Sequence, residues 1–84
     1  MARGRVILSF VKDETQYIAD KIRGVAAEKR ASQDAIAKTL KMSRQAVNAR
    51  MTGRVAFTAP EVLVISRMLD VPVSRFFPEK VGAG

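Results

Sequence analysis

The side chains best suited to recognising a ligand lie together between residues 43 and 48. Arg44 can donate two hydrogen bonds to one guanine, and Gln45 and Asn48 can each pair with adenine through both amide atoms. Ser43 stands in front of them as a good helix N-cap, so a helix that begins here presents its N-terminal end and outer face to solvent. This chemistry fits the major groove of DNA, which is wide enough to admit a helix. The alternative is an ordinary solvated helix face.

Positive charge is concentrated in two parts of the chain. The net charge is +7, from 15 Lys and Arg against 8 Asp and Glu. Residues 1–12 hold three bases and no acid, residues 32–54 hold five bases and one acid, and the other two segments are neutral. Such clustering predicts a polyanionic partner such as nucleic acid, although a basic face that only aids solubility has the same composition.

Several classes of protein are excluded by composition. The chain has no cysteine and no histidine, so disulfides, the usual zinc ligands and Cys- or His-based nucleophiles are missing. We therefore expect no enzyme activity, no cofactor and no metal. No apolar stretch approaches the ~20 residues of a membrane helix, and Val6–Val11 behind Arg3 and Arg5 is too short for a signal peptide. We expect a cytoplasmic protein with no membrane partner and no small-molecule ligand.

The recognition residues need helices to position them, and capping signals delimit those helices. Asp13 and Gln16 fit a capping box, which predicts a first helix from about Glu14 to Lys29. Ser32 and Ser43 are N-cap candidates for two short helices that lie on either side of a tight turn. Their predicted buried side is apolar, and its members are Ile36, Ala37, Leu40, Met42, Val47 and Met51.

A fourth helix and one more turn complete the predicted domain. Thr58 and Glu61 make a second capping box, and the helix runs to about Leu69 before Pro72 breaks it. Gly53 ends the preceding helix, where a left-handed residue is favoured. With 84 residues there is room for one domain. We place an extension at residues 1–12, the domain at 13–78 and a tail at 79–84.

Residues 5–11 (RVILSFV) do not fit the helical pattern as cleanly. The segment is rich in β-branched residues, but both faces of a strand built from it would be apolar. Three interpretations remain open, namely a strand or arm used in self-association, an extension of the first helix, and a disordered arm.

Two stretches resemble a known family, and they are Ser32–Leu40 (SQDAIAKTL) and Met42–Val47 (MSRQAV). Both are similar to the helix-turn-helix of the lambda repressor/Cro superfamily, also called XRE-like. The similarity spans about residues 15–78 and continues through Thr52–Arg54, Phe57–Glu61 and Leu69–Val73. It implies an all-α fold of five helices and a role in transcriptional control, as in phage or prophage regulators.

The resemblance also implies roles for individual residues. Positions that match Arg44, Gln45 and Asn48 reach base edges in the family. We expect contacts with the DNA backbone from a second set, namely Gln33, Lys38, Ser43, Arg50, Thr52 and Arg54.

The chain departs from the family pattern at two positions. Lys41 occupies the turn position that usually holds Gly, so a left-handed conformation there costs ~1–2 kcal/mol. Arg50 stands where an apolar residue is common. We expect it to extend towards a phosphate while Met51 takes the buried position.

Three functions agree with these features. The first is a sequence-specific, double-stranded DNA-binding regulator of the repressor or Cro type, which acts as a homodimer on a palindromic operator. The second is the antitoxin of a toxin–antitoxin pair, and the third is a protein-interaction module without a DNA role. Residues considered for the dimer contact are Val6, Leu8, Phe10, Phe76 and Phe77.

Overall fold

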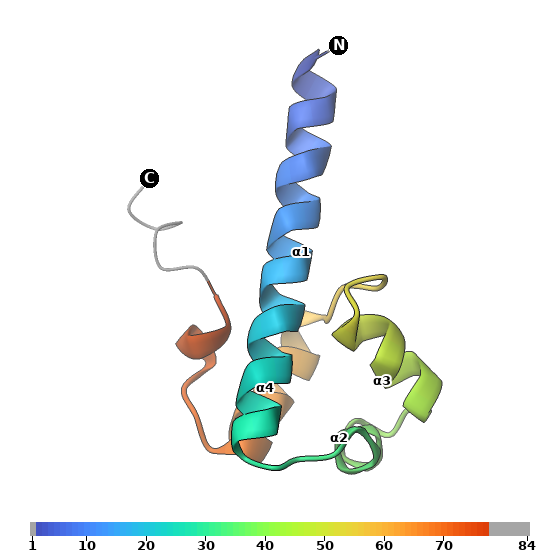
Figure 1. Ribbon diagram of the computed structural model, residues 1–84, viewed down its shortest axis with the longest axis vertical. Coiled ribbons are helices and arrows are strands. Elements are labelled where there is room, and N and C mark those ends of the chain that lie inside the picture. The colour runs from blue at the N-terminus through green and yellow to red at the C-terminus, as the bar shows by residue number, and fades with distance from the viewer. Residues whose placement is uncertain (1, 78–84) are drawn as a thin grey trace.

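The computed structural model describes the backbone of residues 2–77 and the side chains of residues 14–77. The fold is all-α, as predicted, and the described residues contain no strand. Its elements are α1 (Ala2–Glu28), α2 (Gln33–Leu40), α3 (Arg44–Met51), α4 (Ala59–Leu69) and the 3-10 helix η1 (Val73–Phe76) (Figure 1). The expected last helix is thus a single 3-10 turn, because only five residues separate Pro72 from Pro78.

Helix α1 begins at Ala2, twelve residues before the predicted start at Glu14. Residues 13 and 16 lie inside the helix, so the expected capping box does not begin it. Of the three interpretations of residues 5–11, the structure therefore shows the helical extension. The physical reason lies in the sequence: Leu8, Val11, Thr15 and Ile18 stand three and four residues apart, so one helical stripe runs past position 13. The side chains of Val6, Leu8 and Phe10 lie outside the described residues.

The starts of α2, α3 and α4 follow the sequence signals. The hydroxyls of Ser32 and Ser43 accept hydrogen bonds from the backbone N–H groups of Ala35 and Ala46, at 3.1 and 3.0 Å. Thr58 and Glu61 form both hydrogen bonds of the predicted capping box. Each of these residues uses a partner within three positions along the chain, which explains why the N-caps are readable from sequence.

The helix ends share one geometry that uses left-handed residues. Arg30, Lys41, Gly53 and Asp70 have φ angles of 59°, 58°, 84° and 59° respectively. After α2, the Met42 N–H donates to the carbonyl of Ala37 at 3.0 Å and the Lys41 N–H to that of Lys38 at 3.2 Å. Lys41 therefore makes the tight turn without glycine, and the chain accepts the expected strain at this position.

One hydrophobic core joins all five elements. Ile22, Ile36, Val47, Ile65 and Phe76 are completely excluded from solvent. Helix α2 packs against α3 and α4, α1 packs against α3 and η1, and η1 packs against α4. Phe76 was considered for a dimer contact, but its ring is an anchor of η1 in the core of its own chain. Phe77, by contrast, is 41% exposed.

The N-terminal half of α1 extends away from the other helices. The whole molecule measures 42 Å along its longest axis and 27 and 20 Å along the others. In Figure 1 the last turns of α1 lie beside the rest of the fold, whereas its first turns stand clear of α2, α3 and α4. This arrangement leaves α2 and α3 accessible on the side away from η1.

Candidate nucleic-acid interface

Helices α2 and α3 form a compact unit that buries one side of each helix. Ile36 and Val47 are fully buried and Ala37 is 6% exposed. The small Ala37 side chain allows a close approach at the corner, and its carbonyl accepts the hydrogen bond that closes the turn. Because the inner sides are committed to the core, the polar residues on the outer sides are available to a partner.

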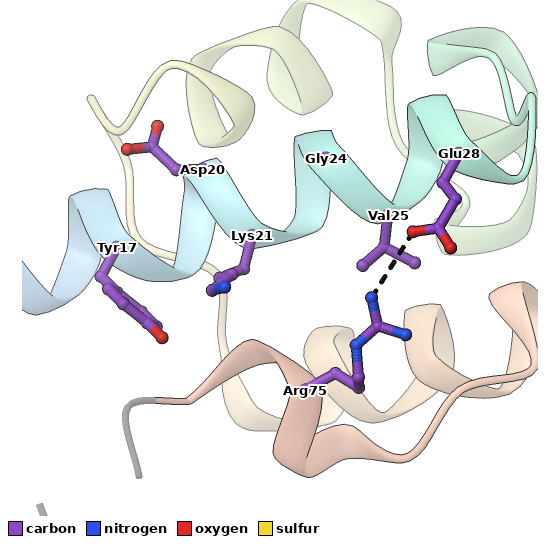
Figure 2. A pocket seen from close by; sticks show the side chains of 7 residues that line it. All are labelled: Tyr17, Asp20, Lys21, Gly24, Val25, Glu28 and Arg75. Carbon is purple, nitrogen blue, oxygen red and sulfur yellow. Dashed lines mark hydrogen bonds and ion pairs between the residues drawn. The ribbon is translucent and has the colours of Figure 1, made fainter. Parts of the chain in front are cut away.

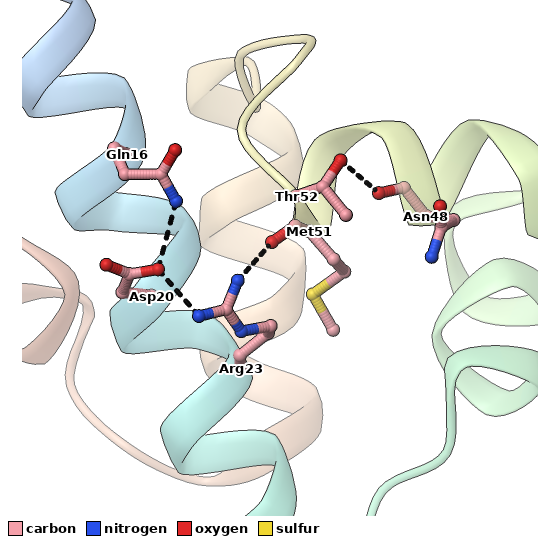
Figure 3. Close-up of polar contacts among 6 residues, drawn as sticks. All are labelled: Gln16, Asp20, Arg23, Asn48, Met51 and Thr52. Carbon is pink, nitrogen blue, oxygen red and sulfur yellow. Dashed lines mark hydrogen bonds and ion pairs between the residues drawn. The ribbon is translucent and has the colours of Figure 1, made fainter.

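The outer side of α3 carries the residues predicted to recognise a base. Arg44, Gln45 and Asn48 are all exposed. The N-cap bond of Ser43 sets the first turn of α3, from which Arg44 and Gln45 project. In Figure 3 the carboxamide of Asn48 points away from α1.

A single open depression collects five of the predicted contact residues. Its lining comes from three parts of the chain: the start of α2, the outer side of α3 and the loop after α3. The lining residues are Gln33, Arg44, Gln45, Asn48 and Arg54. They are 21 positions apart at most, yet the packing of α2 on α3 brings them onto one surface. Polar donors and two guanidinium groups on that surface suit a negatively charged, hydrogen-bonding ligand.

The other predicted backbone contacts lie around this depression or away from it. Lys38 on α2 is exposed, and so are Ser43 and Thr52. The hydroxyl of Thr52 donates to the carbonyl of Asn48 at 3.0 Å, at the end of α3 (Figure 3). None of these three residues lines the depression itself.

Arg50 lies elsewhere, in a contact between helices. Its Nε donates to Oε1 of Glu61 at 3.0 Å, and its Nη1 donates to the carbonyl of Ala46 at 3.0 Å. The side chains of Arg50 and Glu61 are only 18% and 17% exposed. Instead of extending towards a phosphate, Arg50 ties α3 to the start of α4, and Met51 takes the buried position as expected.

The carboxylate of Glu61 is held in its charged form by this environment. Burial raises the pKa of Glu61, but the hydrogen bond from the Thr58 N–H and the Arg50 guanidinium together outweigh burial and lower the pKa below its ordinary value. The pair is therefore ionised at neutral pH, when it links the capping box of α4 to α3.

Arg23 of α1 makes a contact with α3 that the sequence analysis missed. Its Nη1 donates to the carbonyl of Met51 at 2.9 Å, and its Nη2 pairs with Asp20 at 2.7 Å (Figure 3). Gln16 donates to the same Asp20 carboxylate at 3.0 Å. A cation at the C-terminal end of a helix is favourable, so Arg23 both caps α3 and fixes it to α1. In sequence, Asp20 and Arg23 look like an ordinary surface pair.

Gly53 and Gln16 meet at the same junction. A Cβ at Gly53 would collide with the side-chain carboxamide of Gln16. The loop that carries Arg54 thus passes close to the Gln16 side chain of α1, and the Arg54 N–H donates to the carbonyl of Ala49 at 3.0 Å, which ties the loop to the end of α3.

Arg44 has an acidic neighbour within the candidate interface. Its Nε lies 3.5 Å from Oδ1 of Asp34, and the two side chains are 69% and 66% exposed. Asp34 follows Gln33 in the first turn of α2, so this ion pair spans the α2–α3 unit on its solvent side.

A second depression lies on the other side of the molecule, between α1 and η1 (Figure 2). Arg75 of η1 reaches Glu28 of α1 at 3.5 Å across it, and Lys21 stacks over the ring of Tyr17 at 5.5 Å. The remaining lining residues are Asp20, Gly24 and Val25. The charges here compensate one another, which is unlike the cationic depression beside α3.

Among the residues that the structure describes, no group of three or more acidic or histidine side chains is placed to hold a metal ion. Within the same part of the chain, no helix is both long and apolar enough to cross a membrane. No known family model matches this chain, and a search of curated proteins gives no significant match.

Proposed function

We propose that the protein is a sequence-specific, double-stranded DNA-binding transcriptional regulator of the repressor or Cro type. In this proposal α2 and α3 form a helix-turn-helix within a lambda-repressor-like domain, and α3 enters the major groove. The observation that carries the proposal is the common depression of Gln33, Arg44, Gln45, Asn48 and Arg54. Donors for base edges and cations for phosphates there share one accessible surface.

The division of roles follows from where each side chain lies. Arg44, Gln45 and Asn48 are on the outer side of α3 and contact bases. A second set lies around them and contacts the DNA backbone, namely Gln33, Lys38, Ser43, Thr52 and Arg54. Arg50 supports α3 through Glu61 and is not assigned to a phosphate.

The distribution of charge also supports DNA binding by this face of the molecule. Residues 32–54 hold five bases, and only Arg50 among them is tied to a part-buried acid of another helix. The exposed cations around the depression therefore favour a polyanion, and release of its counterions makes the affinity fall as salt rises.

We further propose that the protein acts as a homodimer on a palindromic operator. One helix-turn-helix reads only a few base pairs, and two-fold dimers solve this by binding half-sites about one helical turn apart. The extended N-terminal half of α1 supplies a candidate contact, since residues 6–11 of the sequence hold five large apolar residues.

Selection of bound duplexes from a random pool tests the proposal. We expect one palindromic motif, with a log–log salt dependence of several units for the selected site. Substitution of Arg44 by Ala should cost about 1–3 kcal/mol on that site and relax the preference at one base pair.

Arg67→Ala is the matched control. Arg67 is an exposed arginine on α4 outside the depression, so its loss removes the same charge and should leave the selected motif and its affinity nearly unchanged. A pool with no enriched motif, or an Arg44→Ala protein that selects the original motif with the original affinity, contradicts the proposal.

A further inference from the structure

One acidic residue lies within the candidate interface. Asp34 is the only acid among residues 32–54, and its carboxylate lies 3.5 Å from Nε of Arg44. Both side chains are about two-thirds exposed, and exposed ion pairs add little to folding stability. A carboxylate at this position also repels the phosphates that the surrounding cations attract. An acid is favoured in the first turn of α2, but this does not account for the ion pair that joins Asp34 to Arg44 of α3.

The atoms that form the ion pair suggest an explanation. A guanidinium carries five N–H donors in a rigid planar fork. The carboxylate of Asp34 faces Nε of Arg44 at 3.5 Å, and among the described residues neither Nη group makes a hydrogen bond or an ion pair, so both Nη groups can face a ligand. Two parallel donors are what the O6 and N7 atoms of guanine require.

The carboxylate of Asp34 also makes Arg44 discriminate between a charged acceptor, the DNA phosphate, and a neutral one, the guanine edge. A phosphate that approaches the guanidinium meets the negative charge of Asp34, and part of the attraction is cancelled. A guanine edge carries no net charge, so it pays a much smaller penalty. The ion pair therefore favours base contacts over phosphate contacts by opposing the competing mode of binding.

We propose that Asp34 is a specificity-determining residue that orients Arg44 towards guanine and weakens its binding to DNA phosphates. This inference rests on the proposed function, because it concerns the same interface. It assigns to Asp34 no direct contact with a base.

The test compares two proteins of equal charge. Asp34→Asn and Asp70→Asn each raise the net charge from +7 to +8. Asp70 is the exposed left-handed residue that ends α4 and does not line the depression, and Asn tolerates that conformation well. Dissociation constants are measured for the selected duplex, for the same duplex with the guanine read by Arg44 replaced, and for a random duplex.

For Asp34→Asn we expect a several-fold gain in affinity for the random duplex and about a tenfold loss of discrimination against the replaced guanine. For Asp70→Asn we expect discrimination to stay as in the unmodified protein. Asp34→Ala removes the carboxylate without adding an amide donor, so it should behave like Asp34→Asn. Unchanged helical circular dichroism spectra below the melting transition would show that the variants share one fold.

A double-mutant cycle asks whether Asp34 acts through Arg44. In an Arg44→Ala background, Asp34→Asn should have no further effect on discrimination, because the oriented group is gone. A loss of discrimination that persists in that background would mean that Asp34 reads a base itself, and it would overturn the inference.

Two further outcomes are decisive. If Asp34→Asn and Asp70→Asn change all three affinities alike, Asp34 is only a counter-charge and the inference fails while the proposed function stands. If the unmodified protein discriminates between no duplexes at all, the proposed function fails, and the inference fails with it.

Discussion

At the scale of single residues, Arg50 and Glu61 show how one charged pair serves two helices. Glu61 accepts from the N-cap residue of its own helix and from Arg50 of α3, while its side chain is mostly withdrawn from solvent. Neither partner can be removed without leaving the other in a poorly hydrated position. The pair therefore matters more for stability than an exposed pair such as Glu28–Arg75.

The lowered pKa of Glu61 makes stability depend on pH. Because the pKa is lower in the folded than in the unfolded chain, the contribution of Glu61 is complete above its ordinary pKa of 4.5 and is lost as the pH falls below it. We expect Glu61→Gln to lower the free energy of unfolding by about 1 kcal/mol at neutral pH. This difference should shrink as the pH falls below 4.5, since the carboxylate of the unfolded chain then binds protons more readily than that of the folded chain.

Urea unfolding at several pH values measures this effect. Glu28→Gln is the control, because Glu28 pairs with Arg75 in an exposed position and its loss should change stability very little. A difference between Glu61→Gln and the unmodified protein that stays constant down to pH 3 would show that the charge of Glu61 is not the cause.

At the scale of helices, the two ends of α3 are held by different means. Ser43 caps its N-terminal end from the adjacent turn, whereas Arg23 caps its C-terminal end from α1. The second contact sets the position of α3 relative to the longest helix of the molecule. Side chains on the outer side of α3 can then meet a rigid partner without first paying the cost of ordering the helix.

Two glycines should respond in opposite directions to the same substitution. Gly24 lies inside α1, four residues before its end at Glu28, and a Cβ there has no atom within 4 Å, so Gly24→Ala should stabilise the fold by about 0.5–1 kcal/mol. Gly53 has a φ of 84° and lies against Gln16, so Gly53→Ala should destabilise it by about 1–2 kcal/mol. The free energies of unfolding in urea give both values, and equal signs would contradict the local geometry described for one of these sites.

At the scale of the whole molecule, the N-terminal half of α1 is the helical segment whose position is not accounted for by packing in the hydrophobic core. Among the described side chains of α1, residues 14–28, the first buried one is Ala19, and Figure 1 shows the first turns of the helix standing clear of α2, α3 and α4. Removal of residues 1–12 should therefore leave the core intact but weaken self-association. In the proposed function it should also lower the affinity for the operator, because a homodimer that binds DNA couples the two equilibria.

Sedimentation of the shortened and full-length proteins measures this prediction. A protein with Arg3 and Arg5 replaced by Ala is the control, since it loses positive charge but keeps the apolar residues 6–11. It should retain the dimer constant of the unmodified protein. Equal dimer constants for the shortened and full-length chains would move the interface to the exposed Phe77 region, and a single monomer on the operator would contradict the dimer.

The sequence alone determined the features that depend on neighbours a few positions away. The Ser32 and Ser43 caps, the Thr58–Glu61 capping box and the buried side of α2 and α3 were all predicted, because each uses spacings of three or four residues. The missing cysteines and histidines likewise needed no structure.

Only the tertiary structure decided which partners the arginine side chains contact, because those partners are distant in the chain. Arg50 was expected to contact a phosphate, but it pairs with the carboxylate of Glu61, which lies 11 positions away on α4. The target of Arg23 is a backbone carbonyl 28 positions away, which no side-chain pattern can indicate. The start of α1 is a different case: a local capping signal competed with a longer helical stripe in the same sequence, and in the structure the longer stripe prevails.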